Sequence, residues 1–117
     1  MEPPELLHRF VHGGFEQLTD TQPAELADYL EKQAAQTGQS AALFISQAIR
    51  SVYGLFREHD EHGGTRLGFV LQLDSLVRER LPIIQRSEPH WAAKLARDFR
   101  DEILAKVAAY NPQNTYE

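Results

Sequence analysis

The fold depends most on residues 23–58, which read PAELADYLEKQAAQTGQSAALFISQAIRSVYGLFRE. Two amphipathic runs meet there at the turn-forming residues Thr37 to Ser40. Pro23 suits the start of a helix, because its missing N–H would have no partner there in any case. Gly38 suits the left-handed position that ends a helix, and Ser40 is a good N-cap for the next one. The stretch therefore predicts a hairpin of two helices.

The second run of this hairpin is the most apolar part of the chain. One apolar stripe recurs at helical spacing and is widened by further apolar residues beside it; the stripe consists of Ile45, Ile49, Val52 and Phe56. An apolar sector of that width requires more than one packing neighbour. We therefore expect a central helix at about 41–57.

A short helix is expected before the hairpin, opened by Pro3 and Pro4 and ended by Gly13 and Gly14. Residues 15–22 then fit three interpretations, which are a linker, the end of the first helix, or a short extended segment. Thr21 is a candidate N-cap for the helix that begins at Pro23.

Two further helices are expected after the hairpin. Residues 66–86 carry apolar side chains at near-heptad steps, and Pro82 should break or kink this helix because proline removes a backbone donor. Ser87 is a candidate N-cap for a long last helix at about 89–110. Trp91 begins the apolar side of that helix, either as a core residue or as an interface anchor.

These elements predict an all-α protein, a compact bundle of four to five helices. At 117 residues the chain is most simply one domain, which we expect to span residues 1–111 and to be followed by a flexible C-terminal tail at 112–117. Short connections favour antiparallel neighbours. The 89–110 helix should pack across the central one.

Composition narrows the classes of function. The chain has no cysteine, which excludes disulfides and thiolate chemistry. No apolar run approaches the roughly 20 residues of a membrane helix, and the chain's start does not resemble a signal peptide, so we expect a cytoplasmic protein. The net charge of −5 argues against a strong electrostatic attraction to nucleic acid. No motif indicates a cofactor.

Residues 23–50 nevertheless resemble the helical hairpin of ribbon-helix-helix DNA-binding proteins of the Arc and CopG type. Matching positions include Pro23, Gly38 and Ser40 at the helix ends, and an apolar pattern ending in Ile45, Ala48 and Ile49. The resemblance covers about a third of the chain.

This resemblance implies a dimer whose two chains pair through a strand just before Pro23. It also implies that Gln17, Thr19 and Thr21 read DNA bases and that Ser40 contacts phosphate. The protein would then be an antitoxin-type regulator with a C-terminal half that binds a partner.

Histidines supply the candidate metal ligands. His8 and His12 are four residues apart on the first helix and should share one face. His59 and His62 lie in an acidic stretch, Arg57 to Thr65, which is most simply a solvated loop. A histidine-based metal-binding protein is therefore the third hypothesis about function.

The first hypothesis is a non-enzymatic regulatory or adaptor protein that binds another protein or a second copy of itself. No nucleophile–base pair, phosphate-binding loop or closed ligand set points to catalysis. Candidate partner-binding residues are Trp91, Tyr53 and Arg78. Arg78, with Arg80 and Arg86, forms a basic patch that we expect to pair at the surface with Asp74 and Glu79.

Overall fold

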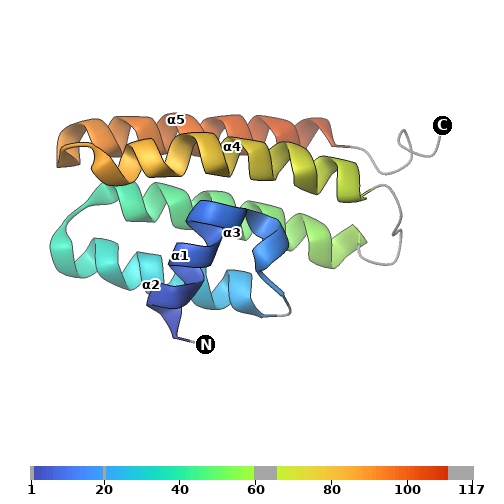
Figure 1. The fold of residues 1–117 in the computed structure, drawn as a ribbon, viewed down its shortest axis with the longest axis horizontal. Helices are drawn as coiled ribbons and strands as arrows, with labels where there is room; N and C mark the ends of the chain where they lie inside the picture. Colours follow the sequence, from blue (N-terminus) through green and yellow to red (C-terminus); the bar gives the residue numbers. More distant parts are fainter. Residues whose placement is uncertain (1, 20, 60–65, 111–117) are drawn as a thin grey trace.

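A computed structural model describes the backbone of residues 2–19, 21–59 and 66–110. Within these ranges it holds five α-helices, one turn of 3-10 helix and no strand (Figure 1). The elements are α1 (Pro3–Gly13), η1 (Phe15–Gln17), α2 (Gln22–Thr37), α3 (Ser40–His59), α4 (Arg66–Arg86) and α5 (Pro89–Ala109). The all-α bundle that the sequence predicts is confirmed. The expected tail at 112–117 lies outside the described residues.

Helices α2 to α5 run alternately in opposite directions, so that consecutive helices are antiparallel (Figure 1). Helix α3 lies between α2 and α5 and makes its main contacts with these two, and α5 runs in the same direction as α3. Helix α4 packs against α5, while α1 and η1 pack against α4 and α1 also contacts α2. The bundle is thus closed by α2, α3, α5, α4 and α1 in that order.

The core confirms the central position of α3. Ile45, Ile49 and Val52 are buried as the apolar stripe predicts, and Phe56 is half-buried against the same core. Opposite them, α5 presents Ala92, Ala96, Phe99 and Ile103, all buried. The alanines on α5 allow the two helix axes to approach closely, because interaxial distance depends on the side chains at the contact.

Two glycines end helices as expected. Gly38 follows α2 in the left-handed region, with φ +70°, and its N–H donates to the carbonyl oxygen of Ala34 at 2.9 Å. Gly14 follows α1 with φ +77°, and its N–H donates to the carbonyl oxygen of Phe10 at 2.8 Å. Thr21 occupies the N-cap position of α2, but its hydroxyl donates to Glu25 Oε1 at 3.3 Å instead of accepting from a helix N–H.

The junction between α4 and α5 differs from the prediction. Ser87 does not cap α5: its hydroxyl donates back to the carbonyl oxygen of Ile83 at 2.7 Å, and Glu88 is the N-cap residue. Pro82 does not break helix α4, which runs on to Arg86, the end that the sequence predicts. Ile84, beyond the proline, is buried in the core, and this packing favours helical backbone to the end of α4.

The core position considered for Trp91 is wrong, since 52% of this residue is exposed. The buried face of α5 begins at Ala92 and Ala96 instead of Trp91, and it continues through Phe99 and Ile103. Burying small side chains there brings α5 close to α3 and leaves the large indole outside. None of the helices in the described part of the chain is long and apolar enough to cross a membrane.

Candidate functional site

Two connections between helices lie at the same end of the bundle. The turn between α2 and α3 and the turn between α4 and α5 lie at the same end (Figure 1). We call this region the hairpin end and define it as residues 36–43 and 83–94. Each connection is only two residues long, Gly38-Gln39 and Ser87-Glu88, so the flanking helical turns stay next to each other.

Large apolar side chains are exposed at the hairpin end. Leu43 is 38% exposed in the first turn of α3, Ile83 is 44% exposed in the last turn of α4, and Trp91 lies in the first turn of α5. In the described part of the chain, the other exposed large apolar residues are Leu71 and Leu104, which lie elsewhere on α4 and α5. Exposed apolar residues are ordinary when scattered, but their concentration at one end is typical of a binding surface.

Charge is distributed unevenly over the same end. No charged residue or histidine occurs between Lys32 and Arg50, so the tip of the α2–α3 hairpin is uncharged. On the other hairpin, Lys94 Nζ lies 5.5 Å from the centroid of the Trp91 ring, and the His90 ring lies at the same centroid distance. An exposed aromatic residue beside an uncharged apolar surface, with charged residues at the rim, is common in protein interfaces.

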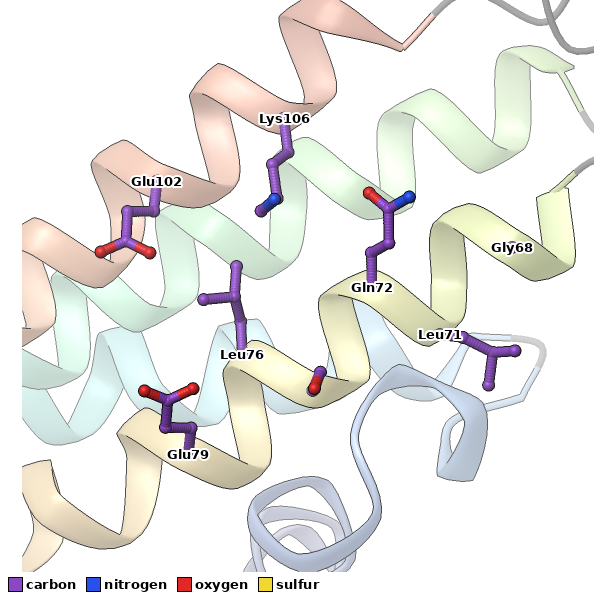
Figure 2. A pocket seen from close by; sticks show the side chains of 8 residues that line it. Gly68, Leu71, Gln72, Leu76, Glu79, Glu102 and Lys106 are labelled. Carbon is purple, nitrogen blue, oxygen red and sulfur yellow. The ribbon is translucent and has the colours of Figure 1, made fainter.

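A different surface feature is the open groove between α4 and α5, which has a volume of about 540 Å³. Its lining consists of Gly68, Leu71, Gln72, Ser75, Leu76, Glu79, Glu102 and Lys106. Figure 2 shows the carboxylates of Glu79 and Glu102 facing each other near one end of the groove, with Lys106 farther along it. Arg80 binds both carboxylates, with Nη1 2.9 Å from Glu102 Oε1 and Nε 3.6 Å from Glu79 Oε1. The groove is therefore largely polar, and the ion pair between Arg80 and Glu102 links its two helices.

A buried carboxylate joins the N-terminal segment to α4. Asp74 is fully buried, and its Oδ1 accepts hydrogen bonds from the N–H groups of Phe15 at 2.6 Å and Glu16 at 3.4 Å. We call this arrangement the Asp74 cap. The expectation that Asp74 pairs with surface arginines is therefore wrong. Its position explains the error: Asp74, Val77 and Leu81 follow each other at helical spacing on the buried face of α4.

The environment of Asp74 is costly for a charge. Burial raises the pKa of the Asp74 carboxyl above its usual range, while the two backbone hydrogen bonds and the charge of Arg78 act in the opposite direction. Oδ2 is buried and has no hydrogen-bond partner among the described residues. The carboxylate accepts the N–H groups of Phe15 and Glu16 and so holds η1 in place, and we therefore interpret the cap as structural.

The predicted partner-binding residues are not brought together. Trp91 lies at the hairpin end, whereas exposed Arg78 lies eight residues before the end of α4, roughly 12 Å along the helix axis. Half-buried Tyr53 lies 13 residues into α3, roughly 20 Å from its start. Of the three predicted residues, only Trp91 belongs to the candidate surface. The other two residues of this surface, Leu43 and Ile83, were not predicted from the sequence. The signal for Leu43 was the uncharged stretch around it.

The residues implied to contact DNA are spread along the chain. Gln17 lies in η1, Thr19 donates both its N–H and its hydroxyl to Gln22 Oε1, and Thr21 precedes α2. Ser40 begins α3. Phe15 and Leu18 are buried in the core, so pairing this segment with a second chain would require their withdrawal. The DNA-binding alternative stays a prediction about a dimer.

Histidines occupy two separate places. His8 and His12 are exposed and adjacent on α1, with ring centroids 4.5 Å apart. His62 and the side chain of His59 lie outside the described residues. Among the described residues, no group of three or more histidine, cysteine, aspartate or glutamate side chains is arranged to hold a metal ion.

Comparison with known proteins does not place this chain in a family. No protein-family model matches it, and no curated protein or solved structure shows significant similarity to it.

Proposed function

We propose that this chain is a non-enzymatic binding protein that recognises another protein through the hairpin end of its bundle. The observation that supports this proposal most is the exposure of Trp91, a residue type that dominates the energetics of protein interfaces. Leu43 and Ile83 add apolar surface at the same end. The expected cytoplasmic location stays a prediction.

The chemistry of the surface defines the partner. Arg86 and Lys94 are exposed within one helical turn of Trp91 or of the α4–α5 turn, and Glu88 is the one acid of this hairpin tip. A complementary partner therefore offers an apolar side chain to the indole and carboxylates to the flanking cations. Self-association is the alternative occupant, and it would bring Trp91 against a second copy of this chain.

Site-specific photo-crosslinking tests the proposal. A photoreactive residue at position 91 should capture a partner chain in cells, whereas the same residue at position 104 should not. Leu104 is a matched control, because it lies on the same helix and is 39% exposed but is remote from the hairpin end. Equal capture at both positions would contradict the proposal.

The dissociation constant for the captured partner then tests the surface quantitatively. Trp91→Ala should weaken binding at least tenfold, as expected for an interface anchor, and Leu104→Ala should leave it unchanged. Lys94→Glu should slow association, since rim charges act mainly on the association rate. Light scattering over a concentration series separates self-association from binding of a different chain. An unchanged affinity in Trp91→Ala would overturn the assignment of this surface.

A further inference from the structure

Helix α1 turns a pair of imidazoles away from the core. Leu6 and Phe10 are fully buried on its inner side, which packs against α2 and α4. His8 and His12 follow them by two residues each, about 200° around the helix, and are both exposed. Their ring centroids are 4.5 Å apart, with an angle of 57° between the ring planes.

We infer that His8 and His12 form a binding site for one divalent transition-metal ion of the Zn²⁺, Ni²⁺ or Cu²⁺ class. Imidazole nitrogen is a preferred ligand of these ions. Two histidines at i and i+4 on one helix face place both donors within reach of the same ion, as in helical zinc sites. This inference is independent of the proposed function, since α1 lies outside the hairpin end.

The fold holds the helix that carries the pair in a fixed position. Leu6 and Phe10 anchor α1 in the core, and its C-terminus leads directly into Gly14 and the Asp74 cap. The backbone of α1 therefore loses little conformational freedom when an ion binds, and this favours affinity. Both rings are solvent-exposed, so an ion reaches them without any opening of the bundle.

The remaining coordination positions fall to water, because no third protein donor accompanies the pair within the described residues. A site with two imidazoles and water selects against Mg²⁺ and Ca²⁺, which prefer oxygen ligands supplied largely by carboxylates and carbonyls. The site therefore discriminates by ligand type. Zn²⁺, Ni²⁺ and Cu²⁺ are the ions it takes.

Calorimetric titration of the full chain tests the site, with Ni²⁺ and Zn²⁺ as probes and Mg²⁺ as the negative control. We expect one ion per chain, and at least a tenfold loss of affinity in His8→Gln and in His12→Gln. Glutamine preserves helix propensity, so these variants should melt like the unsubstituted protein when no metal is present. Metal should raise the melting temperature of the unsubstituted protein much more than that of His8→Gln or His12→Gln.

Two control variants make the test specific. His90→Gln removes an exposed histidine at the hairpin end and should bind the ion with unchanged affinity. The double variant His59→Gln/His62→Gln should also bind normally. Binding that survives in the double variant His8→Gln/His12→Gln, or that disappears in His59→Gln/His62→Gln, would overturn the inference, as would the lack of any binding at micromolar to low millimolar Ni²⁺.

Discussion

Two contacts of this bundle are built on different chemistry. Helices α3 and α5 meet mainly through apolar side chains, with Ile49, Phe99 and Ile103 fully buried, and Arg100 adds an exposed hydrogen bond to Gln47 at the edge of the contact. The segment α1–η1 meets α4 partly through apolar side chains and partly through the buried carboxylate of Asp74. The first contact draws its stability from area and packing. The second depends on one hydrogen-bonding group and on a glycine that leaves room for it.

Loss of packing at the apolar contact should have the largest effect. Phe99→Ala removes a fully buried ring between α3 and α5, and we expect it to lower the free energy of unfolding by about 3–5 kcal/mol. Urea denaturation followed by circular dichroism measures the change. Leu104→Ala on the same helix is the control and should cost less than about 0.5 kcal/mol. Similar losses in both variants would mean that α5 is not packed as described.

Gly14→Ala should have the next largest effect, because it acts on the second contact in two ways. Gly14 has φ +77°, and an added Cβ would lie 2.6 Å from Asp74 Cγ. We expect a loss of about 2–4 kcal/mol, because φ +77° with ψ −161° is a backbone region essentially confined to glycine and because the added Cβ displaces the Asp74 cap.

Gly38→Ala is the matched control for that variant. Gly38 also has a positive φ, +70°, but an added Cβ there meets nothing within 4 Å. Only the backbone cost of about 1–2 kcal/mol should remain. The extra loss in Gly14→Ala combines the contact with Asp74 and the greater backbone cost of ψ −161° at Gly14. Equal losses would show that Gly14 is needed for its backbone conformation alone.

Asp74 itself should give an intermediate effect that depends on pH. Asp74→Ala leaves the Phe15 N–H without its acceptor and should cost about 1–3 kcal/mol. Asp74→Asn keeps an oxygen acceptor and removes the buried charge, so at neutral pH it should be at least as stable as the unsubstituted protein.

The sign of the pH dependence follows from the raised pKa of Asp74. The folded state binds the Asp74 proton more tightly than the unfolded state, so this group lowers stability as pH rises through the interval between its ordinary and raised pKa. The stability of the unsubstituted protein minus that of Asp74→Asn should therefore fall in urea titrations as pH rises above the ordinary pKa of an aspartate. A difference that rises with pH would show that the hydrogen bonds outweigh burial.

The surface ion pair between α2 and α3 should matter least. Arg50 donates to Glu31 Oε1 at 2.6 Å and also contacts Asp28, but its side chain is 41% exposed. Arg50→Gln should cost about 0.2–1 kcal/mol at low salt, and less in high salt because of screening. A larger, salt-independent loss would show that the arginine stem contributes by packing.

Periodicity predicted the apolar contact well and the polar contact poorly. Ile45, Ile49 and Val52 stand at helical spacing, so the central helix and its buried stripe could be inferred from sequence. On α5 the same method placed the start of the apolar face at Trp91 instead of Ala92, because it weighs apolar size and takes no account of how closely α3 approaches. The same reasoning placed Asp74 at the surface, because charged side chains are usually exposed.

The candidate surface was predictable only in parts. Trp91 was recognised as a possible anchor from its residue type, but Ile83 and Leu43 come from different helices. Their grouping depends on the lengths of α2 to α5, which bring both hairpin turns to the same end. Ser46 is a polar residue buried on α3, and its hydroxyl donates to the carbonyl oxygen of Leu43 at 2.7 Å. Local partners of this kind leave no periodic signal.

The Asp74 cap has a consequence for the order in which the chain folds during synthesis. Phe15 and Asp74 are 59 residues apart, so the ribosome needs about 3–12 s after making the first to deliver the second. Helix formation takes on the order of a microsecond, so α2 and α3 can pair long before α4 emerges. Part of the apolar face of α1 therefore stays uncovered until α4 is made, so α1 completes its packing later than α2 and α3, which follow it in the chain.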